Sequence, residues 1–258
     1  MSGYHAAKIL ARRVVSPTVI VLDLEVASTL KSFQPGQWLD FMVPPNKWVG
    51  GFSPASLHSE LPQVQIAVKR SNHPPSAWVH SRESEEIGRP VKVQVGGNCV
   101  LDTAGMTIDQ QPVVFLAGGI GISPLLSMYR QWTELQKERQ KESTTPQNAS
   151  FLYSVSTEEE LVFGLELVET AMSASAPDQH QLIFTLTQQP SWTEAIQKKL
   201  QTQGVQCRTG RYMKDFLETA DRTSSFYLCG PPAMLDEGVD LLEKRGVEKK
   251  NLHFERWW

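Results

Sequence analysis

Two short glycine-containing segments hold the residue types that could bind a nucleotide. The first, residues 118–124, reads Gly-Gly-Ile-Gly-Ile-Ser-Pro and lies between an apolar run and a stretch with helical periodicity. This order predicts strand, turn and helix, with Ser123 as the helix N-cap and Pro124 at the first helical position. Glycines let the backbone approach a ligand, and the free amides at a helix N-terminus favour a phosphate. The predicted pyrophosphate site consists of Gly118, Gly119, Ile120, Gly121, Ile122, Ser123 and Pro124.

A second segment strengthens the prediction of a nucleotide site. Pro124 stands where the dinucleotide fingerprint G-x-G-x-x-G has its third glycine, so the first segment alone suits a plain tight turn equally well. The second segment, Cys229-Gly230-Pro231-Pro232, also lies between an apolar strand and an amphipathic helix. We expect the two strand-to-helix turns to meet at one site, to which Gly230 and Pro231 would contribute.

The elements that position these turns change character along the chain. Short β-rich runs divided by turn residues predict an antiparallel barrel for residues 4–101, with one helical insertion at 74–80. From Pro112 onward, strands alternate with helices, which predicts a parallel α/β sheet. The predicted barrel strands are 6–15, 19–26, 38–43, 64–68 and 91–95. The predicted sheet strands are 113–117, 150–155, 182–186 and 226–228, with helices from 123, near 160–174, near 192–203 and at 233–244. The join falls near residues 109–111.

The composition of the chain excludes several classes of protein and of binding site. Hydrophobic residues make up 40% of the 258 and charged residues 21%, as in an ordinary globular protein, and the net charge of −3 gives no basic field for nucleic acid. No apolar stretch has the length of a transmembrane helix. The three cysteines lie far apart and the six histidines show no ligand spacing, so we expect no metal site and no iron–sulfur cluster. The absence of a signal sequence or presequence indicates a cytosolic protein, or a targeting segment that the sequence does not include.

The pair G-G-x-G-x-S-P and C-G-P-P-x-M, in this order, resembles the nicotinamide half of the ferredoxin-NADP reductase superfamily of flavoenzymes. The resemblance extends over nearly the whole chain. It implies a two-domain β plus α/β fold, with an N-terminal antiparallel flavin-binding β-barrel (1–109) and a C-terminal parallel-sheet nicotinamide-nucleotide domain (112–258). It also implies the cofactors NAD, as NADH, and FAD. Three segments, G-G-F-S (50–53), N-H-P-P (72–75) and E-R-W-W (255–258), resemble one branch of the superfamily in particular.

The resemblance also implies flavin contacts in the barrel. In the superfamily the motif R-x-Y-S-x-x-S binds FAD, and here it matches residues 50–56, Gly-Gly-Phe-Ser-Pro-Ala-Ser. Phe52 would pack on the flavin ring, and Ser53 would hydrogen-bond near flavin N5. Gly50 replaces the arginine that meets the pyrophosphate, so loose FAD binding or FMN stays open. Losing such a charge-assisted contact costs about 1.5 to 3 kcal/mol unless another cation such as Lys69 or Arg70 substitutes. From the residues alone, Phe52 and Ser53 suit barrel core and turn equally well.

A second flavin contact in the superfamily is a G-x-x-S turn that opens a short helix. Residues 74–78, Pro-Pro-Ser-Ala-Trp, lie at the corresponding place. The glycine is missing, while Ser76 and the helix N-terminus remain candidates for binding an anion. We interpret Trp78 as a core residue rather than a ligand contact.

Hydride transfer from nicotinamide to flavin depends mainly on positioning the two rings. The resemblance implies that Cys229 lies beside nicotinamide C4, that Glu255 supplies a carboxylate close to the flavin, and that Trp257 and Trp258 lie over the flavin or the nicotinamide. For Cys229 the alternative is a buried strand cysteine without a ligand. For the two tryptophans it is simple docking of the chain end.

The main interpretation is an NAD(P)H-dependent flavin oxidoreductase that passes electrons to a separate acceptor, which the sequence does not identify. Residues 154–157 contain no arginine or lysine and Glu158 adds a negative charge, which favours NADH over NADPH. The alternative is a degenerate NAD-binding interaction or sensor module without flavin turnover. The replacement of the flavin-binding arginine by Gly50 is consistent with this alternative. The resemblance implies a mitochondrial location, with a cytoplasmic one as the alternative.

Overall fold

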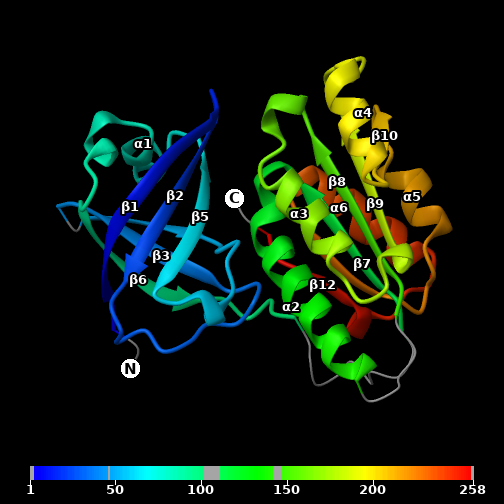
Figure 1. Ribbon diagram of the computed structural model, residues 1–258, viewed down its shortest axis with the longest axis horizontal. Coiled ribbons are helices and arrows are strands. Elements are labelled where there is room, and N and C mark those ends of the chain that lie inside the picture. The colour runs from blue at the N-terminus through cyan, green and yellow to red at the C-terminus, as the bar shows by residue number, and fades with distance from the viewer. Residues whose placement is uncertain (1–2, 46, 102–110, 142–146, 257–258) are drawn as a thin grey trace. The chain divides into compact units, whose positions relative to one another are not determined.

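The computed structural model describes residues 3–45, 47–101, 111–141 and 147–256 (Figure 1). The chain forms two compact units, residues 1–101 and 102–258. The expected join near residues 109–111 lies largely outside the described residues.

The first unit is an antiparallel sheet of six strands in the order β4-β3-β6-β1-β2-β5. An isolated bridge between Pro54, which follows β4, and Ile66 of β5 links the two ends of this order, as in a closed barrel. Buried residues alternate with more exposed ones along β3 and in the second half of β2, while the first four residues of β2 are all buried. The strands are β1 (His5–Ser16), β2 (Val19–Val26), β3 (Trp38–Val43), β4 (Trp48–Phe52), β5 (Gln63–Lys69) and β6 (Pro90–Gly96).

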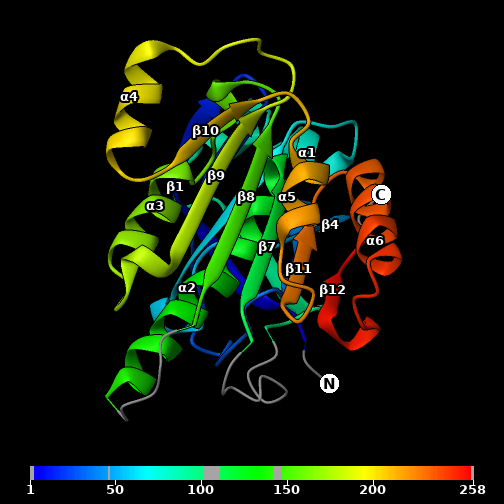
Figure 2. The same ribbon diagram turned by 90° about the vertical axis from the view of Figure 1, so that its right-hand side faces the viewer.

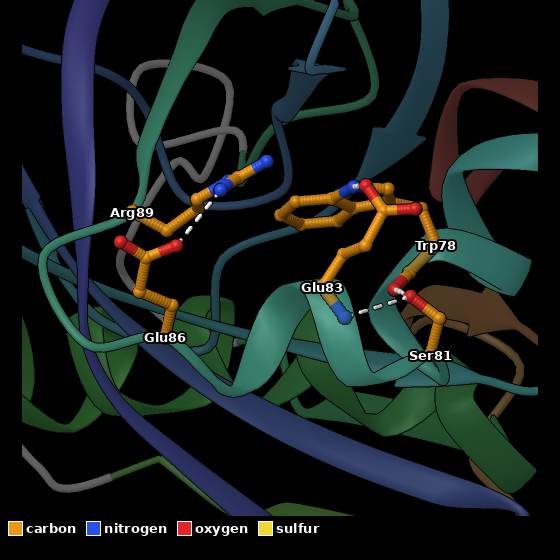
Figure 3. Close-up of polar contacts among 5 residues, drawn as sticks. All are labelled: Trp78, Ser81, Glu83, Glu86 and Arg89. Atoms are coloured by element: carbon orange, nitrogen blue, oxygen red, sulfur yellow. Dashed lines mark hydrogen bonds and ion pairs between the residues drawn. The ribbon is translucent and has the colours of Figure 1, made fainter.

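The predicted helical insertion is α1 (Pro74–Val79), followed by the 3₁₀ turn η2 (Arg82–Glu85). Trp78 is 4% exposed within the core of this unit, and its indole N–H donates to Glu83 Oε2 at 3.0 Å (Figure 3). The Ser81 hydroxyl donates to the Trp78 carbonyl oxygen at 2.8 Å and accepts from the Glu83 amide at 3.2 Å. Trp78 is therefore a core residue, as we expected.

The second unit contains a parallel sheet of six strands in the order β10-β9-β8-β7-β11-β12. Figure 2 shows α2, α3 and α4 on one side of this sheet and α5 and α6 on the other. The strands are β7 (Val113–Gly118), β8 (Ala149–Val155), β9 (His180–Leu186), β10 (Gln206–Thr209), β11 (Ser225–Cys229) and β12 (Leu252–Phe254). The helices are α2 (Ile122–Gln140), α3 (Gly164–Met172), α4 (Glu194–Thr202), α5 (Met213–Thr219) and α6 (Pro232–Lys244). Besides η2, the 3₁₀ turns are η1 (His58–Glu60) in the first unit and η3 (Gly119–Gly121), η4 (Glu158–Glu160), η5 (Pro177–Gln179) and η6 (Lys249–Asn251) in the second.

Aromatic packing holds the centre of the parallel sheet together. Every residue of β7 is buried, as expected of a strand covered on both faces. The Phe115 ring stacks between Phe151 of β8 and Tyr227 of β11, with ring centroids 5.4 and 5.5 Å apart. The strands that carry the two glycine turns are thus fixed against each other by large buried side chains.

The two-domain β plus α/β fold is confirmed, and four elements were not predicted. β4 falls within the glycine-rich segment, where we expected only the flavin motif. The strands β10 and β12 are four and three residues long, too short for a periodic pattern, and the seven-residue helix α5 has a single buried turn, Met213, Phe216 and Leu217. Among the described residues, no helix is both long and apolar enough to cross a membrane.

Candidate functional site

The two glycine turns lie side by side where the order of the parallel sheet reverses. From β7 the chain passes to β8 on one side, while β11 pairs with β7 on the other side. Helices α2 and α6, which start just after these strands, lie on opposite faces of the sheet (Figure 2). In open α/β sheets, such a reversal leaves a crevice at the carboxyl ends of the strands, where ligands bind. The expectation that both turns meet at one place is thus met by the topology.

Close backbone contact explains why glycine is required at two positions of the turns, 121 and 230. A Cβ atom built on Gly121 would lie 2.2 Å from the Cys229 carbonyl oxygen and 2.8 Å from the Gly230 amide nitrogen. A Cβ on Gly230 would lie 3.0 Å from both the Cα and the amide nitrogen of Gly118. The distances at Gly121 are too short for real atoms and those at Gly230 are tighter than almost all real contacts, so the turns pack backbone to backbone. Gly121 and Gly230 therefore serve the contact between the turns as much as any ligand.

Gly119 differs from its neighbours, because a Cβ built on it would have no heavy atom within 4 Å. Its φ of 52° lies in the left-handed region, which favours glycine. Gly119 is therefore the glycine of the turn whose missing side chain leaves open space, which suits the close approach of a phosphate.

The predicted helix start is wrong by two residues. α2 begins at Ile122 with Gly121 as its N-cap, because the chain is already helical at Gly121 (φ −61°, ψ −8°). Ser123 therefore lies inside the first turn and Pro124 follows it there. The Ser123 hydroxyl is buried, and it has no hydrogen-bond partner within the part of the chain that the structure describes. A buried polar atom of this kind is normally satisfied, which makes this hydroxyl a candidate for contact with a bound group.

Cys229 and Glu255 lie at neighbouring strand ends. Cys229 is the last residue of β11, is 7% exposed and pairs with Ala117 of β7. Leu228 of β11 pairs with Phe254, the last residue of β12. Glu255 therefore comes directly after β12 at the level where Cys229 ends β11. Burial raises the pKa of the Glu255 carboxyl above its ordinary value. The sheet therefore brings a thiol and a partly desolvated carboxyl group to the same carboxyl edge as the glycine turns.

Glu158 lies just beyond β8 and is held at the N-terminus of α4. Its carboxylate accepts from the Thr193 amide at 2.9 Å and, through a very short contact, from the Thr193 hydroxyl. These hydrogen bonds lower the pKa of Glu158, so the negative charge that we expected at this position is maintained.

In the first unit, the residues predicted to contact the flavin lie at the end of β4. Phe52 is partly buried against the core and meets Phe41 edge to face at 5.9 Å, and Ser53 follows it, partly exposed. A Cβ on Gly50 would lie 3.1 Å from His73 Cε1, Phe52 Cε2 and Pro75 Cβ. Two segments that indicated one branch of the superfamily, G-G-F-S and N-H-P-P, are therefore in contact. The glycine makes room for the residues that open α1.

The Ser76 hydroxyl is occupied by backbone groups. It donates to the Lys69 carbonyl oxygen at 2.7 Å and accepts from the Ser71 amide at 2.9 Å, and Ser76 is 2% exposed. Because its single proton is used, the hydroxyl has none left to donate to a phosphate. Trp257 and Trp258 lie outside the described residues. Among the described residues, no group of three histidine, cysteine or acidic side chains could hold a metal ion.

Met234 has a role at the turns that the sequence did not suggest. A Cβ on Gly118 would lie 2.6 Å from Met234 Sδ, and a Cβ on Gly230 would lie 2.7 Å from Met234 Cε. The thioether therefore fills the space beside both glycines. The spacing of C-G-P-P-x-M was visible in the sequence, but spacing alone does not show what the methionine contacts.

Comparison with known proteins agrees with this geometry. Residues 115–239 match the family described as oxidoreductase NAD-binding domain. The chain is 34% identical over 249 residues to oxidoreductase NAD-binding domain-containing protein 1 of Danio rerio, which covers 94% of this chain and 88% of that protein.

Two solved structures share the fold. A ferredoxin NADP⁺ reductase from Neisseria gonorrhoeae with bound FAD and NADP has a TM-score of 0.73 and 16% identity, with 99% of each chain covered. A ferredoxin reductase in carbazole 1,9a-dioxygenase has a TM-score of 0.74 and 17% identity, covering 99% of this chain and 70% of that one. At these identities the likeness concerns the fold.

Proposed function

Because the chain belongs to the family of oxidoreductase NAD-binding domain-containing protein 1, we propose that it is an NADH-dependent flavin oxidoreductase that delivers electrons to a separate acceptor. The observation that carries the proposal is the meeting of two glycine turns at the reversal point of the parallel sheet. That arrangement offers the close backbone approach and the helix N-terminus that a dinucleotide requires, at the position where open α/β sheets bind their ligands.

The residues of the second unit have distinct roles in this proposal. The open space at Gly119 accepts the pyrophosphate, and the unpartnered Ser123 hydroxyl donates to the nucleotide. Cys229 presents a small, polarizable side chain to the nicotinamide ring and takes no part in the hydride transfer itself. Glu255, whose pKa is raised by burial, supplies a carboxylate at this edge of the sheet.

The flavin part of the proposal rests on the first unit. When bound, a flavin supplies an acceptor for the nicotinamide hydride and a source of electrons for the next protein. Phe52 and Ser53 offer a partly exposed ring and a hydroxyl at the end of β4, which suits a flavin ring. The pyrophosphate of FAD has no equally clear partner. Gly50 has no side chain, and the Ser76 hydroxyl already donates its proton to the Lys69 carbonyl oxygen. We therefore propose that FAD is bound less tightly than in relatives that have an arginine at that position.

The close packing around Gly50 favours a second candidate function. If His73 and Pro75 fill the space that a phosphate-binding side chain would need, the chain could be an NAD-binding interaction module without flavin turnover. This candidate shares the nicotinamide site and differs only in the first unit.

The visible absorption spectrum of the purified protein separates the two candidates. An oxidoreductase should show flavin bands, as isolated or after incubation with FAD, and NADH should bleach them in the absence of oxygen. A protein that stays colourless after incubation with FAD but still binds NADH would support the interaction module instead.

The preference for NADH is part of the same proposal. Glu158, held in its ionised form by Thr193, would repel the 2′-phosphate of NADPH, and residues 154–157 contain no cation to offset it. The measurement is kcat/KM for the two cofactors, with Glu158→Gln as the informative variant. A higher value for NADPH than for NADH in the unchanged protein would refute this preference.

A further inference from the structure

Two backbone contacts and one side chain join the two glycine turns. Gly121 meets the Cys229–Gly230 backbone, and Gly230 meets the backbone of Gly118, in both cases without an intervening side chain. Met234 packs beside the second contact, with its Sδ near Gly118 and its Cε near Gly230. A substitution of Met234 can therefore disturb the packing against both turns without removing a glycine.

The position of Met234 is itself well defined by the first turn of α6. Its amide donates to the Pro231 carbonyl oxygen at 2.9 Å, and the next amide, that of Leu235, donates to the same oxygen at 3.1 Å. The side chain packs at the edge of the core cluster that includes Leu116, Leu228 and Leu235. Its backbone end is thus anchored in α6, while its thioether end reaches the two turns.

We propose that Met234 is a positioning residue for the nicotinamide nucleotide, because its thioether packs against both of the turns that bind it. This inference rests on the proposed function, since it concerns the same crevice. An unbranched thioether fits beside both glycines, whereas a shorter side chain leaves a gap there and a branched one is too wide. The role is one of geometry, and Met234 transfers no proton or electron.

The test compares Met234→Ala, Met234→Gln and a matched control, Leu241→Ala, in the full-length protein. Leu241 lies on the same helix and is likewise partly buried against the same core cluster. The dissociation constants of NADH and NAD⁺ are measured by calorimetry, and thermal unfolding is followed in parallel. We expect Met234→Ala to weaken NADH binding at least tenfold. Met234→Gln, which keeps the unbranched length, should recover most of that loss. Leu241→Ala should lower the melting temperature by a similar amount and change NADH affinity less than twofold.

Two results would overturn the inference. One is NADH affinity unchanged in Met234→Ala, and the other is an equal loss of affinity in Met234→Ala and Leu241→Ala, which would indicate general destabilisation. Failure of the unchanged protein to bind either nucleotide would instead refute the proposed function, and the positioning role with it. Steady-state kinetics adds a further readout, since a positioning defect should raise KM for NADH more than it lowers kcat.

Discussion

At the first glycine turn, Gly119 and Gly121 have different tasks, which substitutions can separate. Gly121→Ala would place a methyl group 2.2 Å from the Cys229 carbonyl oxygen, so we expect the free energy of unfolding to fall by about 1 to 3 kcal/mol. Gly119→Ala meets no atom but has an unfavourable φ, which costs about 1 to 2 kcal/mol. Because its methyl group enters the space assigned to the pyrophosphate, NADH affinity should fall as well.

Urea denaturation and calorimetric titration measure these two effects separately. The sequence alone suggested that both glycines admit the phosphate, since a glycine in a turn does not reveal what its missing side chain would meet. If Gly119→Ala binds NADH as well as the unchanged protein does, the turn is not part of the nucleotide site.

Glu255 is the titratable residue at this edge whose behaviour should be visible in turnover. Burial raises its pKa above the ordinary 4.5, and we expect the ionised carboxylate to be the active form. Turnover should then fall as the pH is lowered through this raised pKa, and the acidic limb of the pH–rate profile should be absent in Glu255→Gln. Asp236→Asn removes a nearby exposed carboxylate that pairs with Arg256 and serves as the control. An acidic limb that persists in Glu255→Gln would assign it to another group.

At the scale of elements, the sequence predicts best what repeats over several residues. β2 and β3 begin and end at the residues predicted, because each is an apolar run with at least half of its residues buried, continuous in the first half of β2 and alternating throughout β3. β10 has no fully buried residue, and it is ordered by pairing with β9 rather than by a pattern of its own. The same limit applies to the site. The motifs located both turns, but the contacts of Gly121 and Met234 join residues far apart in sequence and needed the fold.

The packing of α2 on β9 predicts a pH dependence of stability. Tyr129 of α2 forms a very short hydrogen bond with His180 Nδ1 of β9, and Trp132 meets the same imidazole at 5.4 Å. Burial lowers the pKa of His180 from 6.5 to about 4. The unfolded chain therefore binds a proton more readily between these values. The stability contributed by neutral His180 is complete above pH 6.5 and is lost as the pH falls toward 4.

We expect this loss to be on the order of 1 to 2 kcal/mol, because His180 is partly exposed and solvent weakens the effect. Urea denaturation at several pH values gives the slope, which should be shallower in His180→Gln than in the unchanged protein. Equal slopes in both proteins would mean that His180 is not responsible.

At the scale of the whole molecule, the two units divide the chemistry between them. Each unit has its own core cluster, and every residue of the proposed nicotinamide site lies in the second. A fragment of residues 112–258 should therefore unfold cooperatively and bind NADH with an affinity within about threefold of that of the full chain. It should bind no flavin, as difference absorption would report. A folded fragment that fails to bind NADH would show that the nicotinamide site needs residues of the first unit.

The chain end offers a test of how nicotinamide access is controlled. The chain is held up to Arg256, whose guanidinium pairs with Asp236 at 2.7 Å and lies over the Phe254 ring at 5.3 Å. A variant that ends at Arg256 keeps this anchor and removes only Trp257 and Trp258. If Trp257 covers the flavin, the truncated protein should bind NAD⁺ more tightly and oxidise NADH faster with oxygen as the acceptor, because a ring no longer has to move aside. Its melting temperature should stay within about 2 °C, since each buried aromatic would otherwise contribute a few kcal/mol. A lower melting temperature with unchanged NAD⁺ affinity and oxidase rate would show that the tryptophans fasten the chain end and do not act as a cover.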